Sequence, residues 1–138
     1  MNNWFYKGEE VTDINQLPEN TFGFIYEITH ISSGKKYIGK KQVMSYRTLP
    51  PLKGEKKKRK VVKEGDWKTY YGSHAEVKKL VKESKEDFKR EILQFVPTKK
   101  QLTYFENKWL FCKGVIESDS EYYNDNIENR YFKKDFLI

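Results

Sequence analysis

The chain has 138 residues, 37% of them hydrophobic and 16% aromatic, which supplies the core of one domain and makes a second domain unexpected. Lysine and arginine number 27 against 20 aspartates and glutamates, so the formal net charge of +7 favours a polyanionic partner, with nucleic acid as the leading candidate. The single cysteine excludes a disulfide framework, and no apolar run approaches the roughly 20 residues that span a bilayer. Because Met1 is not followed by a basic stretch and an apolar run, we expect no secretory signal and a cytoplasmic protein.

Pattern and composition divide the chain into three parts. Residues 1–21 predict an irregular lead-in. Residues 22–127 carry the strand and helix patterns of the folded domain, with a basic insertion at residues 50–66, and residues 128–138 predict a C-terminal tail. The aromatics at the end of the chain favour packing of this last segment onto the domain over stacking on bases, and they are Tyr122, Tyr123, Tyr131 and Phe132.

A β-hairpin is the first predicted element of the domain. Residues 22–31 are apolar, aromatic and β-branched, residues 32–35 read Ser-Ser-Gly-Lys, and a strand-like run resumes over residues 36–43. Two strand-like runs separated by a short segment that contains glycine are typical of a hairpin.

The hairpin is expected to place Tyr26 and Tyr37 on one face of the sheet, since side chains alternate with period two. A turn centred after Ile31 brings the two tyrosines directly opposite each other, which is the register we expect, whereas a turn centred after Ser33 offsets them by four residues. A bulge at Gly34 would change the pairing locally. On the hairpin alone, simple aromatic packing is favoured over chemistry as the explanation of the pair.

The basic insertion predicts a solvated, mobile loop. Residues 53–63 hold seven positive charges against Glu55 alone, at Lys53, Lys56, Lys57, Lys58, Arg59, Lys60 and Lys63. Such a loop suits a clamp on the phosphate backbone, with steeply salt-dependent binding and little sequence preference. Lys40 and Lys41 at the end of the hairpin extend the same basic surface. A solubilising loop without a partner and a nuclear-import signal are the alternatives.

Two helices and a third strand complete the predicted elements. Residues 67–71 read as a strand, and Ser73 with Glu76 forms a capping box for a helix to about residue 85. Residues 88–96 predict the third strand. Thr98 with Gln101 forms a second capping box, for a helix through about Lys113.

Glu106 is the most informative residue of this last helix. Its apolar stripe is formed by Leu102, Phe105, Trp109 and Cys112, and Glu106 falls within the stripe, four residues after Leu102. A carboxylate on an apolar face requires a partner. The partner is either a lysine, in a salt bridge at the edge of the stripe, or a metal ion at the margin of a cleft.

Taken together, these residues resemble the GIY-YIG nuclease family over most of the chain. Phe24-Ile25-Tyr26 stands for the first motif, with Phe24 where the family usually has glycine, and Tyr37-Ile38-Gly39 stands for the second. Arg47 matches the family's arginine, which lies on the helix after the hairpin, and Glu106 matches the glutamate, which lies on a later helix. The segments Tyr70-Tyr71-Gly72-Ser73 and Phe88-Lys89-Arg90-Glu91-Ile92-Leu93 look like small phage-encoded members related to homing endonucleases.

Three further positions bear on this resemblance. Asn124 best matches the family's asparagine, with Asn126 as a rival, and an amide there orients or supports rather than acts as a base. Many members carry a histidine one helical turn after the arginine, where this chain has Pro51. His74 is a candidate to supply that imidazole, against the alternative of a surface histidine at the start of a helix.

The resemblance implies an α+β fold, with a small central antiparallel sheet of about three strands flanked by helices. It also implies one divalent ion, Mg²⁺ with Mn²⁺ as a substitute, held by Glu106, and it implies Arg47 on the scissile phosphate. One hairpin tyrosine, Tyr26 in preference to Tyr37, would position or deprotonate the attacking water, although a tyrosine is a weak base at its usual pKa near 10. Hydrolysis would leave a 5′-phosphate and a 3′-hydroxyl.

Two functions are therefore expected from the sequence. One is an endonuclease acting on DNA, with double-stranded DNA as the expected form, and the other is a nucleic-acid-binding protein that has the nuclease fold but little or no cleavage activity. The first is favoured because a binding protein has no need for a carboxylate at Glu106. One active site cuts one strand, so double-strand cleavage requires a homodimer or two successive nicks. Target preference is expected to come from the insertion, the termini or an oligomer, and RNA remains an open alternative to DNA.

Overall fold

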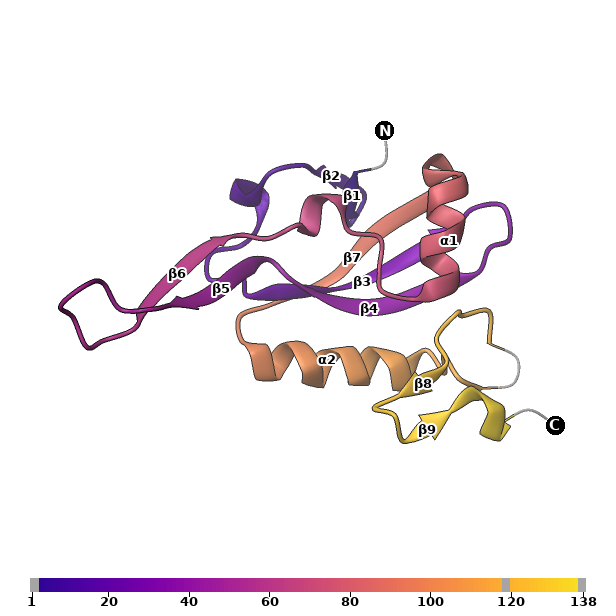
Figure 1. Ribbon diagram of the computed structural model, residues 1–138. Coiled ribbons are helices and arrows are strands. Elements are labelled where there is room, and N and C mark those ends of the chain that lie inside the picture. The colour runs from indigo at the N-terminus through magenta and orange to yellow at the C-terminus, as the bar shows by residue number, and fades with distance from the viewer. Residues whose placement is uncertain (1–2, 118–119, 137–138) are drawn as a thin grey trace.

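The sheet at the centre of the structure has five strands in the order β2-β1-β7-β3-β4, and β1 pairs with β7 in parallel while the other pairs are antiparallel (Figure 1). The computed structural model describes residues 3–117 and 120–136. The sheet strands are β1 (Trp4–Tyr6), β2 (Glu9–Val11), β3 (Gly23–His30), β4 (Lys36–Gln42) and β7 (Phe88–Val96). The α+β class is confirmed, but the sheet has five strands where about three were expected.

The remaining elements lie outside this sheet. The α-helices of the described residues are α1 (Ala75–Glu83) and α2 (Lys99–Cys112). Two further strand pairs are β5 (Met44–Leu49) with β6 (Arg59–Glu64) and β8 (Asn126–Ile127) with β9 (Tyr131–Phe132). Short 3-10 helices occur at Ile14–Gln16, Trp67–Thr69, Lys85–Asp87 and Lys133–Phe136. Neither α1 nor α2 has the length and apolar character needed to cross a membrane.

The N-terminal segment is part of the sheet, so the expectation of an irregular lead-in is wrong. Lys7 and Gly8 both have positive φ, 49° and 84°, which is the conformation of a two-residue turn between paired strands. Trp4 on β1 is 1% exposed and its indole N–H donates to the carbonyl of Trp67 at 2.6 Å. Strands of three residues are too short to show alternation in the sequence, which explains why β1 and β2 were missed.

The hairpin of β3 and β4 is confirmed, but its register differs from both registers considered. Tyr26 lies opposite Gly39, and Tyr37 lies opposite Ile28, so the tyrosines are offset by two residues on one face. The cause is the loop of residues 31–34, which is closed by hydrogen bonds from Gly34 N to His30 O and from His30 N to Lys35 O, both 2.8 Å. Gly34 supplies the positive φ of 75° that this loop requires.

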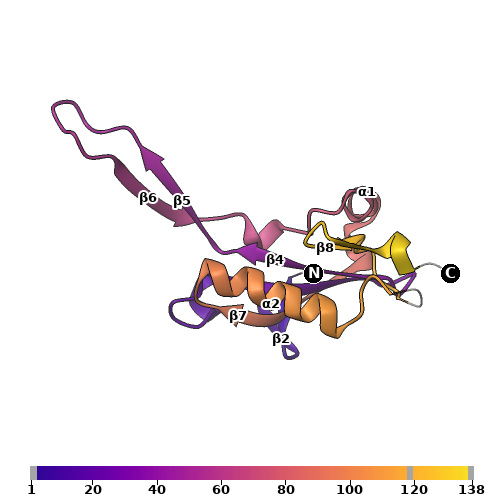
Figure 2. The same ribbon diagram turned by 90° about the horizontal axis from the view of Figure 1, so that it is seen from below.

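Two hydrophobic clusters, one on each face of the sheet, hold the layers together. One cluster joins the sheet to α1 and includes Trp4, Phe24, Tyr26, Trp67 and Val77. The other joins it to α2 and includes Ile25, Ile38, Leu102, Leu110 and Ile127. Because Ile25 and Tyr26 are neighbours on β3, their side chains enter opposite clusters. Figures 1 and 2 show α1 and α2 on the two sides of the sheet.

The helix and strand predictions downstream are mostly confirmed, but Cys112, expected in the buried stripe of α2, is exposed, and Leu110 is buried instead. The third strand has the expected bounds, and α2 begins after Thr98, whose hydroxyl accepts the N–H of Gln101 at 3.1 Å. The first capping residue was wrong: α1 begins after His74, whose ring accepts the N–H of Glu76, and Ser73 lies outside the helix. Residues 67–69 form a 3-10 helix rather than a strand, with Trp67 fully buried as its anchor.

The basic insertion forms a ribbon rather than a mobile loop. β5 and β6 pair antiparallel over six residues, and both views show the ribbon extending from the body beyond the end of β4 (Figures 1 and 2). Arg47 lies on β5, so the helix that the resemblance implies at this position is absent. Only residues 50–58, which connect the two strands, remain as the expected basic loop.

Candidate active site

A cavity of about 330 Å³ lies along β4, the edge strand of the sheet. Its walls come from β4, the start of α1, the middle of α2 and residues 124–129. Four of the residues singled out in the sequence line it together, namely Tyr37, His74, Glu106 and Asn124. These four positions span 88 residues of sequence, and the fold brings them to one edge of the sheet.

Asn124 seals part of the edge of β4. Its side-chain amide donates to the carbonyl of Ile38 at 2.8 Å and accepts the N–H of Ile38 at 3.1 Å, so it replaces a neighbouring strand at that residue. Lys36 is paired in the same way by the backbone of Glu121 and Tyr123. Asn124 is 6% exposed, which fits the structural role expected of it. Asn126 also lines the cavity, but its side chain accepts the N–H of Asn129.

Glu106 points from α2 into the cavity without a close ionic partner. Its side chain is 20% exposed, and Lys40 Nζ lies 4.0 Å from Oε1. Burial raises the pKa of the Glu106 carboxyl, the charge of Lys40 lowers it, and Glu128 raises it again. Lys40 itself donates to the hydroxyl of Thr103 at 2.9 Å. Of the two partners considered for this carboxylate, the lysine is therefore present, but at the outer limit of an ion pair.

The hairpin tyrosines belong to a cluster of three. The ring of Tyr26 lies 6.3 Å from that of Tyr37 and 5.9 Å from that of Tyr70. Burial raises the pKa of Tyr26 well above its usual value of 10, and the nearby Tyr70 raises it further, through its proximity and a hydrogen bond between the two side chains. Burial also raises the pKa of Tyr37, while a hydrogen bond with Ser73 lowers it. Tyr37 is the member that lines the cavity, and Tyr26 is 1% exposed.

Two glycines make room for the Tyr26 hydroxyl. A Cβ at Gly39, directly across the ladder, would collide with the Tyr26 hydroxyl, and a Cβ at Gly72 would come within 3.4 Å of it. Gly72 also has a φ of 91°, which L-residues rarely adopt. The tyrosine of the first motif therefore fits only because the second motif has a glycine opposite it.

His74 is fixed by two hydrogen bonds. Its Nδ1 accepts the N–H of Glu76 at 3.2 Å, so the ring proton is on Nε2, which lies 2.8 Å from Asp125 Oδ2. The ring packs 5.7 Å from that of Tyr37 and 5.9 Å from that of Tyr123. The imidazole thus reaches the cavity, and it carries a structural role as the N-terminal cap of α1 as well.

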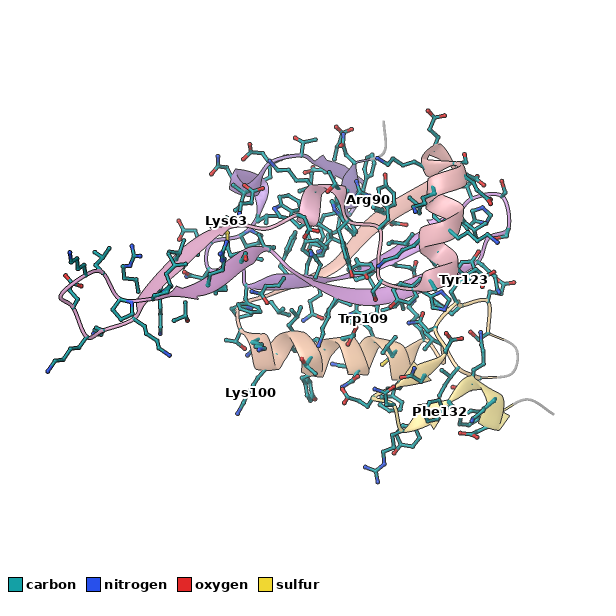
Figure 3. All side chains as sticks on the ribbon, in the orientation of Figure 1. Lys63, Arg90, Lys100, Trp109, Tyr123 and Phe132 are labelled. Carbon is teal, nitrogen blue, oxygen red and sulfur yellow. The ribbon has the colours of Figure 1, made fainter. Side chains whose placement is uncertain are left out.

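Tyr70 is the site residue that sequence reasoning missed. It packs between the hairpin and Lys41, whose Nζ lies 4.2 Å from the ring centroid. Arg90 Nη1 holds this segment by donating to the carbonyls of Lys68 at 2.9 Å and Tyr70 at 2.8 Å. Figure 3 shows Arg90 near that segment, and its guanidinium lies 4.1 Å from the ring of Tyr71. The Tyr-Tyr-Gly-Ser run was visible in the sequence, but nothing in it indicated contact with the hairpin.

The predicted basic residues separate into two groups. Lys40 is exposed at the rim of the cavity, and Lys41 pairs with Asp66 at the base of the ribbon. Arg47 is exposed on β5 and does not line the cavity with the tyrosines and Glu106. The ribbon carries Lys53, Lys56, Lys57, Lys58, Arg59, Lys60 and Lys63, all exposed. The structure therefore does not bring Arg47 together with the other predicted catalytic residues.

A comparison with protein families gave one match that covers most of the chain. The family model described as "Putative endonuclease segE, GIY-YIG domain" matches residues 4–127. The chain belongs to this GIY-YIG family. The matched residues run from the first residue of β1 to the last residue of β8, so the residues that line the cavity fall within the family domain except Glu128 and Asn129. No curated protein and no solved structure matched the chain.

The Tyr26–Gly39 contact yields a stability prediction. Gly39→Ala is expected to destabilise the fold by about 1–3 kcal/mol, because the new methyl group and the Tyr26 hydroxyl occupy the same space. Removing the hydroxyl with Tyr26→Phe relieves part of this cost, so the two substitutions are expected to be non-additive in a double-mutant cycle. Urea denaturation of the four proteins measures the coupling, and additive losses would contradict the contact.

Proposed function

We propose that this protein is a divalent-metal-dependent endonuclease that hydrolyses phosphodiester bonds in DNA. The observation that carries the proposal is Glu106, a largely buried carboxylate of raised pKa that faces a cavity beside the hairpin tyrosines of a GIY-YIG domain. A carboxylate in such a place opposes folding unless something binds it. Its retention there is explained by a metal-dependent reaction at the edge of the sheet.

The donor set of the cavity suits Mg²⁺, with Mn²⁺ as a substitute. Among the described residues no group of three or more histidine, cysteine, aspartate or glutamate side chains gathers as a metal site, so a softer ion such as zinc has no ligand cage there. Mg²⁺ needs only one or two carboxylates and keeps several waters. Glu106 would hold the ion, with Asp125 and Glu128 in the same cavity. When bound, the ion would neutralise charge on the phosphoryl and leaving oxygens.

The attacking water must lose a proton, and a residue of the tyrosine cluster would accept it. We assign the role of base to Tyr26 on the family resemblance. Because burial raises the pKa of Tyr26 well above 10, it can take the proton only if a bound ion lowers the cost of the proton transfer. Tyr37, at the cavity wall and hydrogen-bonded with Ser73, would position the water or the phosphate. The products of this reaction carry a 5′-phosphate and a 3′-hydroxyl.

The family resemblance assigned contact with the scissile phosphate to Arg47, whereas we propose Lys40 for this contact. The Lys40 ammonium lies 4.0 Å from Glu106 at the rim of the cavity, whereas Arg47 lies on the ribbon. A phosphate placed between the Glu106 site and the tyrosines would therefore meet Lys40 first. His74, held by Asp125 and the start of α1, would support the wall of the site next to Tyr37.

A DNA-binding protein without cleavage activity is the second candidate. Its support is the ribbon, which presents positive charge independently of the cavity. The buried carboxylate speaks against it, since binding a polyanion gains nothing from a negative charge in the neighbouring cavity. The test between the two candidates is whether the purified protein cuts DNA in Mg²⁺ or Mn²⁺. Tight binding without cutting in either metal would establish the binding protein and overturn the nuclease.

Glu106→Gln separates activity from stability. Cleavage is expected to fall by at least about 10²-fold, with DNA binding retained. Because the pKa of Glu106 is raised in the folded state, the ionised carboxylate opposes folding above that pKa. The glutamine variant is therefore expected to melt at a higher temperature than the wild type at pH 7. This advantage is expected to disappear below the unfolded pKa near 4.3, where the glutamate is protonated in both states. The exposed Glu83→Gln on α1 is the control, with neither effect. A variant less stable than the wild type at pH 7 would contradict this account of the site.

Lys40→Met shifts the pH dependence of metal use. Lys40 lowers the pKa of Glu106, so the loss of Lys40 raises that pKa. As the pH is lowered, the variant is therefore expected to lose Mg²⁺-dependent cleavage at a higher pH than the wild type does. The measurement is the Mg²⁺ concentration for half-maximal cleavage across pH 5–8. Lys36→Met on the same strand, where the lysine lies 3.7 Å from Glu27 instead, serves as the control and is expected to leave the profile in place.

Tyr26→Phe and Tyr37→Phe distinguish the two tyrosines. Loss of the base is expected to lower kcat by about 10²–10⁴-fold in Tyr26→Phe, with a smaller loss in Tyr37→Phe, and DNA affinity is expected to be unchanged in both. Single-turnover cleavage with saturating protein provides the rates. A larger loss in Tyr37→Phe would assign the base to the tyrosine at the cavity wall, and full activity in both would mean that the pair only packs.

A further inference from the structure

The β5–β6 ribbon is the most exposed regular element of the structure. Its strands pair with each other over residues 44–49 and 59–64 and belong to no larger sheet. A two-stranded ribbon of this kind is marginally stable by itself in water. It also exposes apolar side chains, with Val61 at 37%, Leu52 at 50% and Val62 at 52%. An element with these properties is suited to contact a partner.

The ribbon holds almost all of the excess positive charge. Residues 44–64 contain eight lysines and arginines and two glutamates, a net charge of +6, while the whole chain has +7. The rest of the protein is therefore close to neutral. A polyanion is drawn to the ribbon rather than to the body, and this agrees with the DNA substrate of the proposed function.

The strand pairing sorts the ribbon's side chains into two faces. Residues directly opposite each other share a face, so one face, here called the basic face, consists of Ser45, Arg47, Leu49, Arg59, Val61 and Lys63. The opposite face carries Met44, Tyr46, Thr48, Lys60, Val62 and Glu64. Tyr46 turns this second face toward the body, because its ring stacks on that of Phe22 at 5.9 Å. The basic face therefore points away from Phe22.

The dimensions and side chains of the basic face fit the major groove. Two strands lie about 5 Å apart, and the major groove of B-DNA, about 12 Å wide, admits a two-stranded ribbon. Six residues of strand span about 20 Å, which is more than half of a helical turn of DNA. Arginine is the side chain best suited to guanine, because its guanidinium donates to O6 and N7 together. With the basic face in the groove, the exposed lysines of residues 53–58 at the tip would be available to the phosphate backbone.

We propose that the β5–β6 ribbon enters the major groove of duplex DNA with its basic face toward the base edges, where Arg47 and Arg59 read guanine. The recognised bases lie away from the cleaved bond, since the ribbon extends from one end of the sheet and the cavity lies nearer the other. Figure 3 shows this separation, with Lys63 on the ribbon side and Tyr123, beside the cavity, at the other end. Recognition of duplex DNA rests on the proposed DNA substrate but not on cleavage.

The test uses binding, so that it does not depend on catalysis. The full chain carrying Glu106→Gln selects bound fragments from a library of random duplex DNA, and the enriched fragments are then treated with dimethyl sulfate. This reagent methylates guanine N7 in the major groove and adenine N3 in the minor groove. The expected result is an enriched sequence that contains guanine, with binding blocked by methylation at guanine N7.

Paired variants assign the contact to named residues. Arg47→Gln, in the same background, is expected to weaken binding to the enriched sequence by about 5–150-fold, to relax the preference at one base pair, and to remove one N7 interference signal. Lys57→Gln at the tip is the matched control, and it is expected to weaken binding to all duplexes equally and to leave the N7 pattern intact. Circular dichroism of both variants verifies the fold.

Three outcomes would overturn the proposal. They are the absence of any enriched sequence, interference at adenine N3 alone, and an unchanged N7 pattern in both Arg47→Gln and Arg59→Gln. Cleavage by the wild-type chain is measured separately. A protein that shows the N7 pattern but does not cut leaves the ribbon's role standing and removes the nuclease, whereas a protein that cuts without the N7 pattern does the reverse.

Discussion

The contact of Tyr26 with Gly39 across the hairpin is the constraint on which the site depends. The Tyr26 ring lies over the one position of β4 where no side chain competes for the space, and this fixes the register of the two motifs at an offset of two residues. That register turns Tyr37 to the same face as Tyr26 and turns Ile38 to the other, into the cluster with α2. A shift of one residue would exchange the two faces and remove Tyr37 from the cavity. The residues of the two motifs therefore fix the strand register, and the register in turn determines which residues reach the cavity.

The second constraint is that β4 is an edge strand. An exposed edge offers unpaired N–H and C=O groups and invites pairing with other chains. Residues 121–124 cover this edge at Lys36 and Ile38 and end there, with the amide of Asn124 acting as the last rung. The cavity begins where the cover ends, and α2 places Glu106 on its far wall. The protected part of the edge and the open cavity thus lie within a few residues of each other along β4.

The sequence predicted the parts of this structure that depend on periodicity and on motif spacing. The third strand, α2 with its Thr98 cap, and the inward Glu106 were correct because each follows from a local pattern or a cap. The predicted register of the hairpin was wrong. The sequence does not distinguish the observed loop of four residues from a loop of two or six, because these loops differ only in the residue at which the turn begins. Tyr70 was missed because its place is set by a long-range hydrogen bond from Arg90, which no local pattern encodes.

At Arg47 the prediction from motif spacing and the observed structure disagree. Its distance from the hairpin matched the family, but a helix is needed to turn that position back toward the tyrosines, and the residues after it favour a strand that pairs with residues 59–64. On a ribbon of net charge +6 Arg47 is one cation among eight, and it lies outside the cavity that Tyr37 and Glu106 line. The near-neutral body then leaves the buried carboxylate of Glu106 free of competing cations except Lys40 among the described residues. Most of the chain's excess positive charge is therefore kept on the ribbon, away from the carboxylate of Glu106.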